Sequence, residues 1–467
     1  MSISRFLITT IVTIASVPSW SEAFVEYPTP QQLPHETILS DSSHSSTKKW
    51  TLNDCVAYAL ENNITLRRSR LSTLSASEDR RQSKAALLPS LSGSTNQSLG
   101  YRPWQDAGTT TVTNGTVNTK VDKHYYNGSY GLNASWTVWN GGRNTNAVRQ
   151  NEIAEQQAAL QEAETANSIE EKIAQLFTQI VYLQEAIEVD KASLETSHKN
   201  EERGREMVDV GKMSRADLSQ LTAQRASDEY AIVEAESQLA NYKLQLKQLL
   251  EITGDEPFDV ATPAATDEQA LEEIPSLQSV YEQALLSRPE MQAAELTVRN
   301  SDIQIAIAKA QRLPTVNMTG GVGTSTNSLS NKGWGSQFKT NVDMSLGASV
   351  QVPIFDQRQA KSSITKAHLQ RQQALLDQQD SQKQLYQTIE GYWLDANTNQ
   401  QKFRAAKATV ESEQQSYDLL SEQFRLGLKN IVELMTGKDR LLTAQQNQLQ
   451  AKYMTILNIQ LLKFYKR

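Results

Sequence analysis

The amino-acid sequence predicts a mostly α-helical, internally duplicated chain that also contributes four strands to a membrane β-barrel. Three observations support this fold class. Very long segments carry coiled-coil spacing. Segments of about ten residues alternate strictly between apolar and polar side chains, as transmembrane β-strands do. Both kinds of segment occur twice along the chain, and such a repeat fixes the architecture.

The first residues predict export from the cytoplasm. Arg5 precedes a short apolar run over residues 6–17, and Ser21 and Ala23 provide small side chains at the spacing that signal peptidase needs. We therefore predict a signal peptide over residues 1–23. Residues 24–49, rich in Pro, Ser and Thr, predict a flexible tether.

The repeat divides the remaining chain into two halves. Residues 59–90 match residues 284–315, an offset of 284 − 59 = 225 positions, and both segments end in a Leu-Pro break at Pro89 and Pro314. Each break is followed by a stretch rich in Gly, Ser, Thr and Asn, an alternating segment, a turn and a long helical segment. We therefore predict a first repeat over residues 50–270 and a second over residues 271–467.

The helical segments are too long for an ordinary globular domain. Apolar residues in residues 169–187 and 232–249 step by three and four, which predicts left-handed packing of helices side by side. The run over residues 144–202 alone would extend roughly 85–90 Å. Each long segment is interrupted at a glycine, Gly211 or Gly427. Shorter helices are predicted over residues 65–87, 214–252, 290–312 and 430–465, so two short helices in succession can accompany one long helix.

Four segments predict membrane strands, over about residues 90–101, 128–140, 315–325 and 342–353. The second and fourth alternate cleanly, with apolar side chains on one face and Asn, Ser and Thr on the other, as expected for a lipid face and a lumen face. Aromatic residues such as Tyr101, Trp104, Trp139 and Trp334 cluster near the strand ends, where the membrane interface would lie. The alternative is a soluble β-sandwich edge that packs on helices.

Four strands cannot close a barrel by themselves. An open sheet edge in lipid leaves backbone groups unpaired, each costing several kcal/mol, and bacterial membrane barrels begin at about eight strands. Several copies of the chain must therefore share one barrel. The strand count predicts an oligomer without selecting its size.

Composition argues against several other classes of protein. The net charge of −7 comes without a basic block, so nucleic acid is not an expected partner. The five histidines are scattered without metal-ligand spacing, and the chain has one cysteine, Cys55, which we interpret as a small buried apolar residue. Because no nucleophile and base form a catalytic constellation, we expect neither an enzyme nor a bound cofactor or metal.

Taken in order, these motifs resemble the TolC-type outer-membrane efflux protein family. The resemblance covers about residues 50–465 and rests on the opening over residues 52–63, the two Leu-Pro breaks, and an acidic residue that follows each interrupting glycine, Asp217 or Glu433. It implies a trimeric tube with a twelve-stranded barrel in the outer membrane and an α-helical barrel in the periplasm. It also implies an exit duct that works with a periplasmic adaptor and an inner-membrane pump of RND or ABC type, for efflux or for type I secretion.

The resemblance also implies sites at the periplasmic tip. The residues that match the family's gate are Asp217, Phe424, Lys429 and Glu433, with the Lys429 position bonded to the Asp217 position. Phe424 replaces a tyrosine of the family, and Thr436 stands where a second acidic residue can occur. As an alternative, Lys429 and Glu433 are four residues apart on a helix and would form an ordinary solvated pair.

The two tips match the family's docking point for the adaptor, through Val210, Gly211, Leu426 and Gly427. A plain helix-terminating glycine would explain Gly211 and Gly427 equally well. For the whole protein, the alternative function is that of a structural coiled-coil surface protein or adhesin. We expect such a protein, unlike an outer-membrane duct, to be removable from membranes by carbonate or salt.

Overall fold

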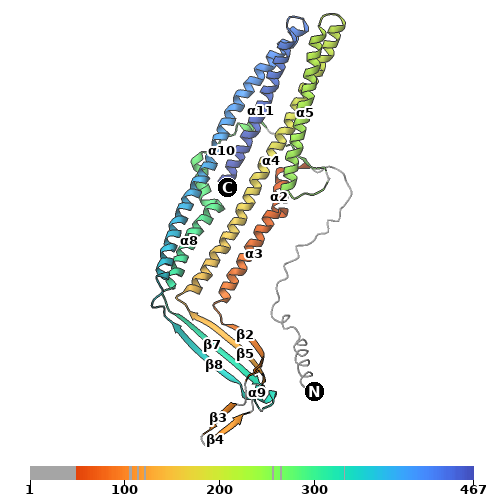
Figure 1. The fold of residues 1–467 in the computed structure, drawn as a ribbon. Helices are drawn as coiled ribbons and strands as arrows, with labels where there is room; N and C mark the ends of the chain where they lie inside the picture. The colour runs from red at the N-terminus through yellow and green to blue at the C-terminus, as the bar shows by residue number, and fades with distance from the viewer. Residues whose placement is uncertain are drawn as a thin grey trace, which may run out of the picture. The chain divides into compact units, whose positions relative to one another are not determined.

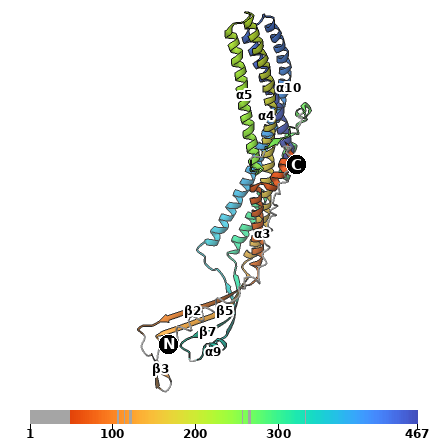
Figure 2. The same ribbon diagram turned by 90° about the vertical axis from the view of Figure 1, so that its right-hand side faces the viewer.

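A computed structural model describes residues 49–104, 108–112, 115–119, 123–254, 257–262, 266–330 and 332–467. The predicted signal peptide and the predicted tether up to residue 48 lie outside these residues. The unit formed by residues 49–467 contains long helices, and its main β-sheet lies at one end of them (Figures 1 and 2). Within the described residues, no helix combines the length and the apolar character that crossing a bilayer requires.

The main helices form two sets whose lengths match. The first set has 11, 22, 67 and 35 residues: α2 (Leu52–Asn62), α3 (Ile64–Ala85), α4 (Arg143–Asp209) and α5 (Arg215–Leu249). The second set has 11, 22, 67 and 36 residues: α7 (Leu277–Ser287), α8 (Pro289–Ala310), α10 (Gln359–Arg425) and α11 (Ile431–Lys466). The internal duplication that the sequence predicts is therefore confirmed.

Each long helix is accompanied by two shorter ones. Helix α3 runs beside the first part of α4, to which it is joined by ion pairs such as Arg80–Glu155 (2.9 Å), and α5 runs beside the last part of α4. Helices α8 and α11 accompany α10 in the same way (Figure 1). At 1.5 Å per residue, α4 and α10 are each about 100 Å long.

The two largest apolar clusters of the described residues occupy equivalent positions in the two repeats. Cys55 and Ala59 of α2 are fully buried against α4 and α5, and Val280 and Ala284 of α7 are fully buried against α10 and α11. The offset of 225 residues relates Cys55 to Val280, since 55 + 225 = 280. The second repeat thus has a valine where the first has the cysteine, as expected for a position that requires a small apolar side chain.

Hydrogen bonds from tyrosine to glutamate join the two repeats. The Tyr453 hydroxyl of α11 donates to Glu185 of α4 (2.5 Å), and the Tyr465 hydroxyl donates to Glu171 of α4 (3.2 Å). Burial and the neighbouring Glu171 carboxylate raise the pKa of Tyr465, so its hydroxyl stays protonated and remains a donor. These bonds lie along the interface between α4 and α11.

The main sheet has four antiparallel strands in the order β2-β5-β7-β8. Their bounds are β2 (Ser90–Tyr101), β5 (His124–Trp139), β7 (Thr315–Asn327) and β8 (Asp343–Gln351). Strand β5 carries a bulge between Thr137 and Trp139. All four strands form where the sequence places them, although β5 begins at His124 and not near residue 128. Strands β2 and β8 are the edges of the sheet.

Several small elements are not predicted by the sequence. Strand β1 (Lys49–Trp50) pairs in parallel with β6 (Asp259–Val260), and β3 (Gly108–Val112) pairs with β4 (Gly115–Thr119). Helices α6 (Asp267–Ala270) and α9 (Trp334–Thr340) are each less than two helical turns long. Segments this short contain too few residues to show a helical or strand period.

Candidate functional site

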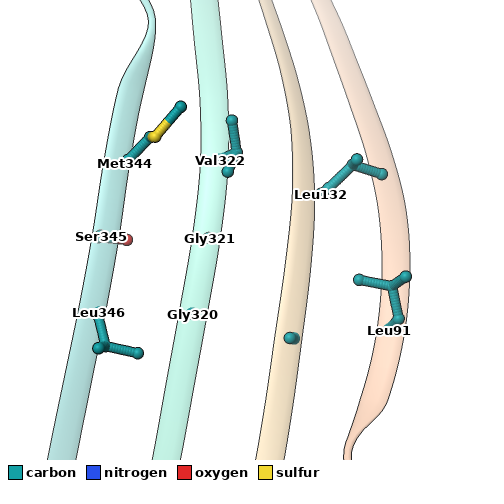
Figure 3. A pocket seen from close by; sticks show the side chains of 9 residues that line it. Leu91, Leu132, Gly320, Gly321, Val322, Met344, Ser345 and Leu346 are labelled. Carbon is teal, nitrogen blue, oxygen red and sulfur yellow. The ribbon is translucent and has the colours of Figure 1, made fainter.

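One face of the main sheet is apolar across all four strands. The strand register places Leu91 of β2, Leu132 of β5, Val322 of β7 and Met344 of β8 on this face. Figure 3 shows these side chains on four neighbouring strands, around a shallow hollow of about 460 Å³. The side chains are exposed in the single chain: Leu346 is 81% accessible and Met344 75%. A surface this apolar is typical of a contact with lipid or with another protein.

The opposite face consists mainly of small polar residues and glycines. Across the sheet it carries Ser, Asn, Thr and Gln side chains interspersed with glycines, for example Ser92, Asn133, Thr319 and Ser345. Several are bonded between strands, such as Thr137 to Asn317 (3.0 Å) and Asn133 to Ser94 (3.3 Å). No Asp, Glu, Lys, Arg or His occurs in residues 90–101, 125–139, 315–327 or 344–351. One apolar face and one polar, uncharged face are the pattern expected for strands between lipid and a water-filled lumen.

The register clarifies strands that the sequence alone left ambiguous. Strands β2 and β7 alternate weakly because glycine, threonine and glutamine occupy part of the apolar face, at Gly93, Thr95, Gln97 and Gly320. Neighbouring strands supply apolar side chains beside Gly93 and Gly320, but not beside Gln97, which pairs with Gly128. Strand pairing, which is not visible in one segment, therefore establishes the two faces.

At the other end of the molecule, both long helices end in the same turn. Gly211 and Gly427 adopt positive φ values of 74° and 75° directly after α4 and α10. Lys212 N donates to Met207 O (2.7 Å), and Leu428 N donates to Gln423 O (2.8 Å). This is the Schellman ending, which favours glycine because a Cβ is strained at positive φ. A Cβ on either glycine would meet no atom within 4 Å, so neither tip is filled by the chain's own side chains.

The acidic residue after each glycine caps the next helix. Asp217 is the third residue of α5, and its backbone N–H donates to the N-cap Ser214 hydroxyl (3.1 Å). Glu433 has the same place in α11 and forms a reciprocal capping box with Asn430. Helix geometry therefore accounts for the glycine-to-acid spacing in both tips.

The predicted gate residues lie close to one tip or the other, but they do not all interact. Within the described residues, the Lys429 ammonium bonds Glu433 (2.5 Å) and not Asp217. Lys429 and the Asn430 backbone N–H hold the pKa of Glu433 below its usual range. Phe424 is buried in an apolar cluster with Leu221 and Leu434, so it packs and does not project outward. The predicted docking residues Val210 and Leu426 are exposed at 68% and 64%.

The sequence did not reveal a buried polar cluster that joins both helical hairpins. Lys438 of α11 forms an ion pair with Asp228 of α5, and both bond to Ser197 of α4. Lys438 is 4% exposed and Asp228 8%. The three residues come from separate helices at unrelated sequence spacings. The only signal was that each occupies a position where the heptad pattern would favour an apolar residue.

Comparison with known proteins settles the family. The profile of a family described as outer membrane efflux protein matches residues 56–251 and 280–463, one segment in each repeat.

The chain belongs to the outer membrane efflux protein family.

Among its relatives, outer membrane efflux protein BepC of Brucella suis is 23% identical over 403 residues, which cover 86% of this chain and 82% of BepC. Outer membrane protein TolC of Vibrio cholerae is 23% identical over 303 residues, or 65% of this chain and 68% of TolC. The crystal structure of VceC from Vibrio cholerae superposes with a TM-score of 0.73 at 17% identity, covering 89% of this chain and 96% of VceC.

The comparisons confirm the predicted family, fold class and outer-membrane location. An outer membrane efflux protein contacts lipid, and the apolar face of the main sheet is the part of this chain suited to that contact. Membership in this family therefore disfavours the alternative of a soluble β-sandwich edge for the main sheet. Membership in an efflux family also disfavours the alternative of a coiled-coil surface protein or adhesin.

Proposed function

We propose that three copies of this chain form one tube, which is the exit duct of a tripartite efflux pump or of a type I secretion system. The observation that carries this proposal is the sheet: four strands with one apolar face, one uncharged polar face and two open edges, β2 and β8. Backbone groups at open edges cannot remain unpaired in lipid, so copies of the sheet must join edge to edge. Three sheets give twelve strands, well above the minimum of about eight.

In this proposal the hairpins α4–α5 and α10–α11 extend into the periplasm and surround the same lumen. Their tips present exposed apolar side chains, Val210, Leu426 and Leu428, next to glycines with no side-chain cover. Such a tip suits the close approach of another protein's backbone. We propose that it receives a periplasmic adaptor, which connects the duct to an inner-membrane pump of RND or ABC type.

We further propose that the tips close the resting duct. Lys429, Glu433 and Asp217 provide charges at the ends of α10, α11 and α5, where neighbouring copies would converge. In a single chain the Lys429–Glu433 pair is a partly exposed contact between residues four apart, and solvent screens such a pair, so it stabilises the tip little. Closure then depends on Lys429 exchanging this partner for a carboxylate of a neighbouring hairpin, such as Asp217. Phe424 would support the tip by packing beneath it.

Planar-bilayer recording tests the duct and its gate together. The detergent-purified protein should have the mass of a trimer and should insert as a pore of low resting conductance. Lys429→Ala should raise the resting conductance severalfold, because a closing contact is lost, and Asp217→Ala should act in the same direction. Lys212→Ala, which removes an exposed lysine from the other tip, is the matched control.

Two outcomes would contradict this proposal. A mature protein that stays monomeric and water-soluble without detergent would exclude the shared barrel. A conducting trimer whose Lys429→Ala and Asp217→Ala variants match wild type would exclude only the gate.

A further inference from the structure

The short helix α9 lies on the apolar face of the main sheet. The Tyr130 ring of β5 contacts Trp334 (ring centroids 6.3 Å apart) and Phe338 (5.5 Å apart) in edge-to-face arrangements. The Thr324 hydroxyl of β7 donates to the Phe338 carbonyl oxygen (2.9 Å). Tyr130 and Thr324 are direct partners across the strands, and they share their face with Leu132 and Val322. The connection between β7 and β8 therefore returns over the lipid side and not over the polar side.

Hydrogen bonds hold α9 in this position. The buried Gln337 side chain accepts from Asn327 N (2.8 Å) and donates to Asn327 O (3.0 Å) and Lys332 O (2.7 Å). The Asn341 side chain donates to Ser325 O (2.7 Å). These bonds tie the middle of the helix and the residue after its C-terminal end to the last residues of β7. The helix is a fixed part of the sheet surface, so its exposed side chains are presented in a defined direction.

The charges of the sheet region gather at the same end. The four strands have no charged side chain between their ends, whereas Arg102, Lys123, Lys332 and Lys339 lie where β2, β5 and β7 are farthest from the helices. Asp343 is the acidic residue at this end within residues 90–104, 123–139 and 332–351. Among the described residues, the ammonium groups of Lys332 and Lys339 form no ion pair. Figure 2 shows α9 at this end, remote from the long helices.

Trp334 and Phe338 remain partly exposed, at 52% and 39%, and their rings stack (centroids 5.4 Å apart). Exposed aromatic rings that continue an apolar strand surface, with lysines beside them, match the boundary between lipid chains and headgroups. We infer that α9 is an interfacial anchor, which places its two rings at this boundary and binds phosphate-bearing lipid headgroups through Lys332 and Lys339. This inference rests on the proposed membrane position of the sheet. It identifies lipid headgroups as the partner of the sheet end that carries α9.

Lipid retention tests the lysines. The detergent-purified oligomer is incubated with lipid A, which carries two phosphates, and the lipid that remains bound after gel filtration is quantified. Neutralising both lysines in K332Q/K339Q should lower the apparent affinity on the order of tenfold, because each lysine near an anionic headgroup contributes severalfold. The control K172Q/K402Q neutralises two exposed lysines of α4 and α10 and should retain lipid A like wild type.

Two further arms identify the ligand. Phosphatidylcholine, whose phosphate is balanced by choline, should show no difference between K332Q/K339Q and wild type. Inorganic phosphate at millimolar concentration should compete poorly with lipid A if the acyl chains and the aromatic rings share in binding. Equal lipid A retention by K332Q/K339Q and wild type would overturn the inference, and so would full competition by inorganic phosphate.

Fluorescence quenching tests the position of the helix in reconstituted vesicles. The tryptophan emission of Trp334 is taken as the emission that is lost in W334F. Lipids brominated near the headgroup should quench it, whereas iodide that enters the lumen of the pore should not. The opposite result would place α9 over the pore and overturn the inference. Conductance of the same preparation tests the two proposals separately. A conducting trimer in which brominated lipids do not quench Trp334 would contradict the proposed anchor and would still support the proposed duct.

Discussion

At the scale of single residues, the buried Lys438–Asp228 pair should be sensitive to substitution. Both side chains are buried, and with Ser197 they link α4, α5 and α11. Lys438→Met should lower stability by about 3–5 kcal/mol, because it leaves the Asp228 carboxylate buried without its counter-ion. The midpoint of helix unfolding in denaturant, followed by circular dichroism, measures the change.

Two further variants give this prediction its controls. Lys191→Met removes the same side chain from an exposed pair with Glu188 and should change stability by less than about 1 kcal/mol. The double variant Lys438→Met/Asp228→Leu should recover much of the loss, because no unpaired charge remains. Equal midpoints for Lys438→Met and Lys191→Met would contradict the prediction.

Individual residues show where prediction from the sequence stops. The identities of Gly211 and Gly427 predicted turns, because few residues other than glycine adopt the positive φ found there. The environment of Phe424 could not be predicted, since its burial depends on how α4, α5, α10 and α11 pack. For the same reason, only the structure shows that Ser197 meets Lys438, whereas the spacing of four residues already offered the Lys429–Glu433 pair as an alternative.

At the scale of elements, arginine substitutions at neighbouring positions of β8 should differ in their effects on assembly, because the two positions lie on different faces of the sheet. Leu346 lies on the apolar face and Ser345 on the polar face. Leu346→Arg should cost about 2–4 kcal/mol, as a cation near the bilayer midplane does, and should reduce assembled oligomer in the outer membrane. Ser345→Arg, one residue away, should assemble normally.

The amount of oligomer in isolated outer membranes, resolved without boiling, checks this pair of variants. Equal assembly of Leu346→Arg and Ser345→Arg would show that the apolar face does not meet lipid. Reduced assembly of Ser345→Arg alone would show that the faces are reversed.

The elements were more predictable than their environments. The long helices repeat one apolar spacing over many turns, so both their existence and their approximate ends could be predicted. The strands β5 and β8 alternate within themselves, but β2 and β7 depend on their neighbours for an apolar face. Helix α9 has seven residues, which is too short for a period, and its place on the sheet depends on hydrogen bonds to β7.

At the scale of the whole molecule, the proposed duct places its tips farthest from the membrane. Cysteines at Val210 and Leu426, in a Cys55→Val background, should therefore cross-link in cells to a periplasmic adaptor. Cys55→Val is a suitable background because Val280 occupies the equivalent buried position. A cysteine at Val233, 63% exposed in the single chain and farther along α5, is the control.

Mass spectrometry of the cross-linked species decides this prediction. Capture of one adaptor through both tip positions, and not through position 233, would support docking at the tips. Adaptor capture through position 233 with none at the tips would contradict it. The pump that co-purifies would also distinguish drug efflux from polypeptide secretion.

The open edges of the sheet have a genetic consequence. Strands β2 and β8 need partners from other copies, so one defective chain disrupts the whole barrel ring of the oligomer that it joins. A cell that makes equal amounts of normal and edge-defective chains would keep only about one ring in eight fully normal, if three copies mix at random. Mutations in these edge strands should therefore be dominant over the wild-type allele, whereas mutations that prevent synthesis should be recessive.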